Sequence, residues 1–106
     1  MKKKIVSLVL VAFISTSIIS ATGYKIDHNK GYFDYGVQYL GFTHYRQYSQ
    51  VDHKTKYHRA SVIVRYCPDN FNINYKEYAY KNKIAWTSSK YATCLKVRNS
   101  YYWYQV

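Results

Sequence analysis

Apolar and polar residues alternate along the middle of this chain with a period of two. In the segment His58–Tyr66 the even-numbered positions are mostly apolar and the odd-numbered positions are mostly polar, with Ile63 as the exception. Residues 71–80 alternate in the same way, and Pro68, Asp69 and Asn70 between the two segments are typical of a turn. Since a period of two places successive side chains on opposite faces of a strand, these segments predict an antiparallel hairpin with one buried face.

Further strand-like segments flank this hairpin. Residues 32–45 are rich in aromatic side chains, and Gly36 and Gly41 within them indicate a bulge or a bend. Residues 84–91 are a weaker candidate, Leu95 and Val97 follow, and residues 100–106 form a final aromatic strand. No segment has a helical stripe with capping residues. The pattern predicts five to seven short strands in a small antiparallel sandwich or barrel.

The first residues have the features of a secretion signal rather than of the fold. Lys2, Lys3 and Lys4 precede an apolar stretch over residues 5–19, and small residues follow at Ala21 and Gly23. We expect cleavage after Gly23, with Ala21 as the alternative, so that residues 1–23 are a signal peptide and residues 24–106 a single domain. The alternative is an uncleaved anchor, but the apolar stretch is shorter than the roughly 20 residues that a spanning helix needs.

The charge of the chain narrows the class of its partners. The formal net charge is +11, and without Lys2, Lys3 and Lys4 thirteen Lys and Arg stand against five acids, a net charge of +8. A secreted protein does not meet nucleic acid as its ordinary partner. It meets anionic lipid head groups, teichoic-acid-type polymers and pyrophosphate-linked wall precursors, toward which positive charge raises encounter rates. The alternative is that the charge serves only solubility and nonspecific adhesion.

Cys67 and Cys94 are the two cysteines of the chain. An even number of cysteines in an exported domain favours a disulfide. Neither cysteine lies in a paired spacing typical of metal ligands. Closing this loop would contribute about 3–4 kcal/mol in the chain-entropy model, which is a large share of the stability of so small a domain.

A motif in the centre of the chain carries a family resemblance. Tyr48, Ser49, His53, Lys56, His58, Ala60, Ser61 and Val62 give the pattern YSxxxHxxKxHxASV. Trp86 follows in an Ala-Trp-Thr context, some fifteen residues before Tyr101 and Tyr102. Gly31, Phe33 and Gly36 give a glycine-aromatic-glycine opening. In these features the chain resembles the lactococcin 972 family of secreted bacteriocins, over most of the part that follows the predicted signal peptide.

The resemblance implies a β-sandwich of two small antiparallel sheets, in agreement with the strand pattern. It also implies an antibacterial protein that binds the wall precursor lipid II and blocks septum formation without forming pores. The chain departs from the family pattern in its cysteine pair, its fifteen tyrosines and a longer segment around residues 38–46.

The chemistry of such a ligand suggests candidate binding residues. A pyrophosphate attracts cationic donors, and sugars rest on aromatic faces. The candidates are His53, Lys54, Lys56, His58, Arg59, Trp86, Tyr101, Tyr102 and Trp103. Each group has a plainer alternative: hydrogen bonding within the fold for the histidines, core packing for Trp86, and a solvated turn for Lys54 and Lys56.

The sequence offers little support for catalysis. The five acids are scattered without the paired spacing of glycoside hydrolases, and the serines lack a nucleophile-elbow context. His44, His53 and His58 could be imagined around zinc, but their spacing matches no familiar motif. We therefore expect no catalytic residue, no metal and no cofactor.

Three functions remain open for this secreted protein. The first is a bacteriocin that inhibits wall synthesis by binding an anionic envelope component such as lipid II. The second is a noncatalytic module that binds the cell surface or wall. The third is a cationic protein that disrupts membranes, for which the partner is a membrane surface.

Overall fold

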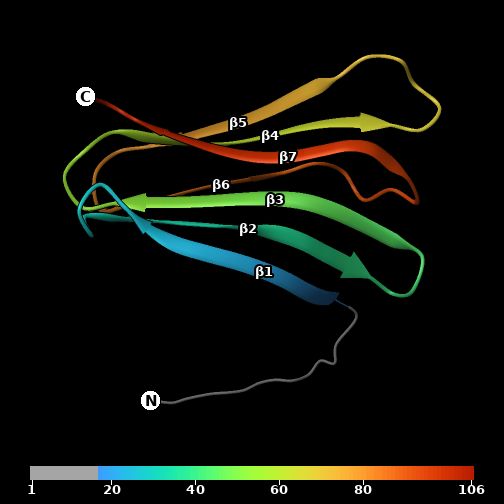
Figure 1. Cartoon of the computed structure of the whole chain (residues 1–106), viewed down its shortest axis with the longest axis horizontal. Helices are drawn as coiled ribbons and strands as arrows, with labels where there is room; N and C mark the ends of the chain where they lie inside the picture. Colours follow the sequence, from blue (N-terminus) through green and yellow to red (C-terminus); the bar gives the residue numbers. More distant parts are fainter. Residues whose placement is uncertain (1–16) are drawn as a thin grey trace.

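The computed structural model describes residues 17–106, and this part of the chain is all-β (Figure 1). The strands are β1 (Ser17–Ile26), β2 (Gly31–Leu40), β3 (His44–His53), β4 (His58–Tyr66), β5 (Ile73–Ala79), β6 (Ile84–Ser88) and β7 (Leu95–Tyr104). They form a four-stranded sheet of order β1-β2-β3-β6 and a three-stranded sheet of order β5-β4-β7, antiparallel throughout. The predicted small antiparallel β-sandwich is confirmed.

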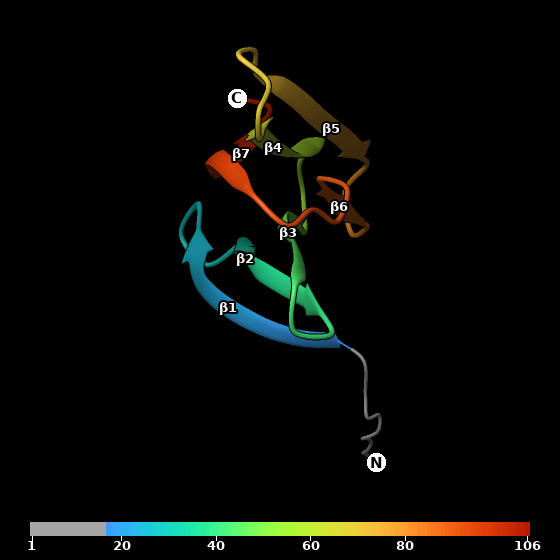
Figure 2. The same ribbon diagram turned by 90° about the vertical axis from the view of Figure 1, so that its right-hand side faces the viewer.

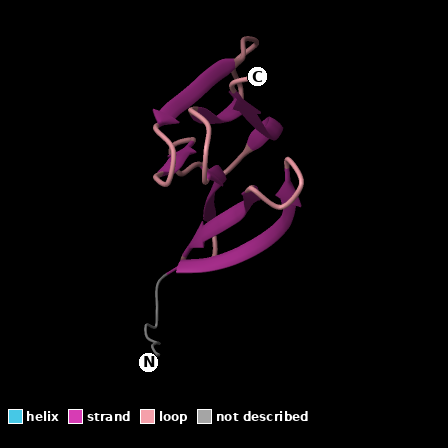
Figure 3. Cartoon of the chain, turned by 90° about the vertical axis from the view of Figure 1, so that its left-hand side faces the viewer, coloured by secondary structure: helices cyan, strands magenta, loops and turns pink. Residues whose placement is uncertain are grey.

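The views along the strands show how the two sheets face each other. In Figure 2, β4 and its neighbours form one layer, and β3 lies between this layer and β2. Figure 3 shows that strands and connecting loops make up the described part of the chain. Within residues 17–106 there is no helix long and apolar enough to cross a bilayer.

The central strand β4 follows the alternation of the sequence closely. His58, Ala60, Val62 and Val64 point into the sandwich and are fully buried, whereas the partly exposed Arg59 lies on the outer face. β4 pairs with β5 on one side and β7 on the other, so its inward residues reach the middle of the interface between the sheets. Its pattern is therefore the clearest in the chain.

The aromatic segment over residues 32–45 forms two strands rather than one. β2 ends at Leu40, and Gly41 in the turn that follows has a positive φ of 67°. Gly36 causes no bulge, because β2 pairs with β3 in continuous register. The bend indicated by Gly41 is thus the turn of a hairpin, and the strand after it was not distinguished in the sequence.

Other strand limits shift by a few residues from those expected. β5 begins at Ile73, so Phe71 lies in the preceding loop and is 54% exposed. β6 stops at Ser88, and β7 is one continuous strand that begins at Leu95 instead of residue 100.

Two apolar clusters fill the sandwich. The first contains Ile26, Phe33, Val51, Ala60 and Ala85, with tyrosines such as Tyr102 packed against it. The second contains Val62, Val64 and Leu95, again flanked by tyrosines. Large aromatic rings therefore complete a core that is otherwise built from small and medium apolar side chains.

Polar side chains also cross the interior and join the two sheets. Ser49 Oγ donates to the carbonyl of Tyr101 at 3.0 Å, and Ser100 Oγ donates to the carbonyl of Tyr48 at 2.7 Å. Gln47 Nε2 donates to Ser100 Oγ at 2.8 Å. Because these hydrogen bonds run between β3 and β7, they fix the position of one sheet relative to the other.

Cys67 and Cys94 form the expected disulfide, with their Cα atoms 5.5 Å apart. Cys67 follows the last residue of β4, and Cys94 precedes the first residue of β7. The bridge therefore closes the end of the sandwich at which β4 stops and β7 begins.

The predicted signal peptide lies mostly outside the described residues, which begin at residue 17. Residues 17–23 form the first part of β1 and pair with residues 34–40 of β2. The expected cleavage position therefore falls within β1, and the signal peptide stays a prediction.

Candidate functional site

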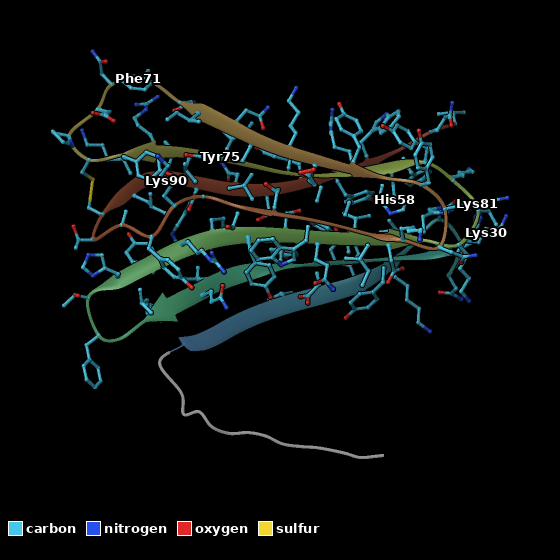
Figure 4. The ribbon with its side chains drawn as sticks, turned by 180° about the vertical axis from the view of Figure 1, so that it is seen from behind. Lys30, His58, Phe71, Tyr75, Lys81 and Lys90 are labelled. Carbon is cyan, nitrogen blue, oxygen red and sulfur yellow. A yellow bond between two sulfur atoms is a disulfide. The ribbon has the colours of Figure 1, made fainter. Side chains whose placement is uncertain are left out.

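Three turns meet at the end of the sandwich opposite the disulfide. They are residues 27–30 between β1 and β2, residues 54–57 between β3 and β4, and residues 80–83 between β5 and β6. The backbone N–H of Lys54 donates to the carbonyl of Lys30, and that of Asn82 donates to the carbonyl of His53, both at 2.8 Å. Figure 4 shows Lys30, Lys81 and His58 together at this end, far from Phe71 and Lys90. We refer to these three turns as the turn end.

His53 organises the turn end from the inside. Its Nδ1 accepts the backbone N–H groups of Thr55 and Lys56, each at 3.1 Å, so the proton of the neutral ring is on Nε2. Nε2 donates to Oδ2 of Asp27 at 2.7 Å. This hydrogen bond, aided by Lys56 Nζ at 3.3 Å, holds the pKa of the Asp27 carboxyl below its usual value. Asp27 itself has a positive φ of 49°, in the turn that brings it to His53.

His58 ties the second turn to the third. Its Nδ1 lies 2.8 Å from the carbonyl oxygen of Lys56, and its Nε2 lies 2.7 Å from the carbonyl oxygen of Lys83. The residue is 0% exposed. Both ring nitrogens are therefore directed at backbone groups inside the fold. The contacts of His53 and His58 give them structural roles in shaping the turns.

The lysines of the turn end, in contrast, reach solvent. Lys30, Lys54, Lys81 and Lys83 are exposed, and the side chain of Lys56 is 33% exposed. One hollow here has a volume of about 210 Å³. Its lining includes Lys25, Lys30 and Lys54, with Asp52 as the acid among them. Three ammonium groups around one hollow form a site that suits an anion.

Aromatic side chains adjoin the turn end on the outer face of the three-stranded sheet. Arg59 of β4 is directly opposite Tyr78 of β5 and Trp103 of β7. Its guanidinium carbon lies 5.9 Å from the ring centroid of Tyr78 and 5.7 Å from that of Trp103. Tyr57 stacks on Tyr78 with centroids 5.6 Å apart, and Tyr80 lies 5.1 Å from Tyr57. We refer to Tyr57, Tyr78, Tyr80 and Trp103 around Arg59 as the aromatic platform.

Arg59 has spare capacity to bind a ligand. Its Nε is buried without a hydrogen-bond partner, and no carboxylate of residues 17–106 forms a salt bridge with it. Next to the platform lies a hollow of about 500 Å³, lined by Thr55, Tyr57, Tyr80, Lys81 and Gln105. This hollow places the rings of Tyr57 and Tyr80 beside Lys81 of the turn end.

The structure brings together some of the predicted binding residues and separates others. Lys54, Lys56, Arg59 and Trp103 lie at the turn end or on the platform. Tyr101 is on the same outer face, opposite Ser61, and is 46% exposed.

Tyr102 and Trp86 lie elsewhere. Tyr102 points inward, with its ring centroid 4.8 Å from that of Phe33. Trp86 is on β6 and belongs to the outer face of the other sheet, where it remains 38% exposed.

Sequence reasoning missed the residues that other turns contribute. Lys30, Lys81 and Tyr80 join the site only because the topology brings their turns together. Tyr57 lies in the same turn as Lys54 and Lys56 and was not singled out. Tyr78 did carry a signal, since it is an aromatic residue on the polar face of the segment over residues 71–80. This position in the alternation predicts that the side chain of Tyr78 lies on the outer face of the strand.

No group of three His, Cys, Asp or Glu residues in the described part of the chain is arranged to hold a metal ion. Comparison of the chain with protein-family models, with curated proteins and with solved structures finds no match. The geometry of the turn end and the aromatic platform therefore carries the functional argument.

Proposed function

We propose that this protein is a secreted antibacterial protein that binds an anionic component of the cell envelope, such as lipid II, and inhibits wall and septum synthesis in related bacteria. The observation that carries the proposal is the junction of the turn end with the aromatic platform. Lys81 lines one hollow together with Tyr57 and Tyr80 of the platform, and Lys30 and Lys54 line another hollow of the turn end. The junction thus offers cationic donors and aromatic faces at the same end of the sandwich.

The chemistry of the surface suits a ligand with a phosphate next to sugars. Ammonium and guanidinium groups form charge-assisted hydrogen bonds with phosphate oxygens, and the Arg59 guanidinium has no salt-bridge partner within residues 17–106. The faces of aromatic rings carry negative charge density, against which the C–H faces of a sugar can pack. The Cys67–Cys94 disulfide supports an oxidising compartment outside the cytoplasm.

The second candidate is a noncatalytic module that binds the cell surface or wall. The same cationic and aromatic surface favours it, because adhesion to an anionic polymer needs charge and rings but no inhibition. Membrane disruption is the third candidate, and leakage assays separate it from the other two.

The test measures growth inhibition by the mature protein on a panel of related strains, with dye leakage from anionic vesicles read in parallel. We expect inhibition without leakage, relieved by added lipid II. Inhibition accompanied by leakage from vesicles without precursor would support membrane disruption. A protein that coats cells and inhibits no strain would be a wall-binding module.

A pair of charge variants locates the activity on the surface. The triple variant Lys30→Gln, Lys54→Gln, Lys81→Gln removes three charges from the turn end, and Lys90→Gln, Lys96→Gln, Arg98→Gln removes three exposed charges near the disulfide. We expect the first variant to lose inhibition and the second to retain it. Equal losses would mean that net charge, and not the turn end, is responsible.

A further inference from the structure

A third hollow lies on the outer face of the four-stranded sheet and differs in chemistry from the two hollows at the turn end. It has a volume of about 100 Å³ and is lined by Asp34, Gln38, Tyr48, Gln50 and Trp86. Its lining contains a carboxylate, two amides, a phenol and an indole, and no lysine. The chain has a net charge of +11, yet the charged residue that lines this surface hollow is the acid Asp34, among neutral polar groups.

Strand register builds this hollow. Asp34 of β2 is the partner of Gln50 of β3, and Gln50 is the partner of Trp86 of β6. The three side chains therefore stand in one row across three neighbouring strands, on the same face. Because the row is set by backbone pairing on a sheet and not by a loop, the carboxylate, the amide and the indole keep their relative positions.

Contacts around the row hold its members in place. The hydroxyl of Tyr48 donates to Oδ1 of Asp34 at 3.4 Å, and the ring of Tyr48 lies 6.3 Å from that of Trp86 at an interplanar angle of 15°. Burial, with the negative charge of Asp34 nearby, raises the pKa of Tyr48 to about 12, so its hydroxyl remains a donor. The side chain of Gln50 is half-buried between Asp34 and Trp86.

Arg46 contacts two of the lining residues, Trp86 and Gln38, and balances the charge of the hollow. Its guanidinium carbon lies 5.0 Å from the ring centroid of Trp86 and 4.4 Å from that of Tyr91. Its Nε donates to Oε1 of Gln38 at 2.7 Å. With one carboxylate and one guanidinium, the local charge is near zero, which favours neither an anion nor a cation.

We propose that the hollow lined by Asp34, Tyr48, Gln50 and Trp86 is a saccharide site that takes one neutral sugar residue of a glycan. Hydroxyl groups of the sugar donate to the Asp34 carboxylate and to the carbonyl oxygen of the Gln50 amide. The N–H groups of the same amide donate to a sugar oxygen. The indole of Trp86, 38% exposed, packs against the C–H face of the ring.

This site is independent of the proposed antibacterial function, because it uses none of the residues of the turn end or the aromatic platform. Its consequence is a protein with two binding sites of different chemistry. One site takes an anionic group and the other a neutral sugar. Two weak contacts to the same polymer would then reinforce each other through effective concentration.

The chain contains two tryptophans, which allows each face to be observed separately. In a Trp103→Phe variant, Trp86 is the sole indole fluorophore and reports on the hollow. In a Trp86→Phe variant, Trp103 reports on the aromatic platform. Both variants are titrated with chitotriose, a neutral trimer of N-acetylglucosamine, and with maltotriose and cellotriose.

We expect a saturable fluorescence change from Trp86 with at least one neutral trisaccharide, and no such change from Trp103. Calorimetry on the unmodified protein should show the same affinity. Asp34→Ala, placed in the Trp103→Phe background, should weaken binding on the order of tenfold or more, because a charged acceptor is lost. Gln50→Ala should weaken it by about fivefold, in keeping with an uncharged hydrogen-bonding group.

Each contrary outcome overturns the proposal. The site is refuted if no neutral trisaccharide gives a saturable response from Trp86. It is also refuted if a folded Gln50→Ala protein binds as well as its parent, so the test does not depend on the folding of the Asp34 variant. Stronger binding of the cationic chitosan trimer than of chitotriose would refute the choice of a neutral ligand. Loss of growth inhibition affects none of these measurements.

Discussion

Nε2 of His53 lies 2.7 Å from Oδ2 of Asp27, so the last residue of β3 is hydrogen-bonded to the first turn of the structure. This contact is possible because Gly31, which opens β2, pairs with His53 across the sheet. The turn before β2 and the turn after β3 therefore lie side by side. One buried imidazole defines the shape of both.

This contact predicts a specific acid sensitivity. The folded-state pKa of Asp27 is lowered from a reference value of 3.8, so the ionised carboxylate is favoured in the folded state. The stabilisation is fully present above the unfolded pKa, and it is lost as the pH falls through the folded pKa. Thermal unfolding measured between about pH 2 and 6 should show a smaller acid-induced loss for Asp27→Asn than for the unmodified protein. Asp69→Asn, near the disulfide, is the control, and parallel curves for all three proteins would contradict the prediction.

Replacement of His58 should destabilise the fold strongly. In His58→Leu the carbonyl oxygens of Lys56 and Lys83 lose their partner inside the protein. Since a neutral imidazole ring has one N–H, at least one of the two oxygens loses its donor, and this costs about 1–3 kcal/mol. The free energy of unfolding, measured with chemical denaturant, should fall accordingly.

His44→Leu is the matched control for this variant. His44 is exposed, and its Nδ1 is hydrogen-bonded to its neighbour Thr43. We expect the control to change the free energy of unfolding by less than about 0.5 kcal/mol, as is usual for surface positions. Equal effects of the two substitutions would show that the carbonyl contacts of His58 are unimportant.

Reduction of the disulfide should lower stability and leave the turn end folded. Cys67 and Cys94 are separated by 27 residues, which corresponds to about 3–4 kcal/mol of unfolded-state entropy. Denaturant unfolding with and without a reducing agent measures this difference. A mass increase after alkylation that requires prior reduction checks the bridge itself. Free thiols in freshly secreted protein would show that Cys67 and Cys94 are not bridged.

The predicted signal peptide can be tested together with the edge that its removal would create. We expect the mass of the secreted protein to correspond to a chain beginning at Tyr24, or at Thr22 if cleavage follows Ala21. Residues 34–40 of β2 then lose the partner strand that residues 17–23 provide. Hydrogen exchange should therefore be faster at the amides of this segment that face β1 than in the full-length chain. A secreted chain that retains Ser17 would contradict the expectation.

The parts of the fold that could be predicted are those with a regular pattern. β4 alternates between fully buried residues that point into the sandwich and outer-face residues, of which Arg59, Ile63 and Arg65 are partly exposed and Ser61 is buried. Its limits agree with the sequence pattern. β3 was missed because two of its inward residues, Gln47 and Ser49, are polar. Gln47 Nε2 and Ser49 Oγ form hydrogen bonds to β7, and such partners distant in sequence leave no periodic signal.

The candidate site was predictable only where it is local in sequence. Lys54, Lys56 and Arg59 follow one another in the chain, and their chemistry could be read there. Trp86 and Trp103 looked equivalent in the sequence and lie on different sheets, because sheet membership depends on crossovers that the pattern does not reveal.

The hydrogen bonds of the Ser100 hydroxyl bear on the size of a ligand that could contact both outer faces of the sandwich. Its hydrogen bonds with the Tyr48 carbonyl and with Gln47 Nε2 help to fix the two sheets relative to each other. The distance between Arg59 on one sheet and Trp86 on the other is therefore fixed as well. A compact molecule would contact only one of these two residues at a time. Only a long, flexible polymer that passes around the edge of the sandwich would contact both residues.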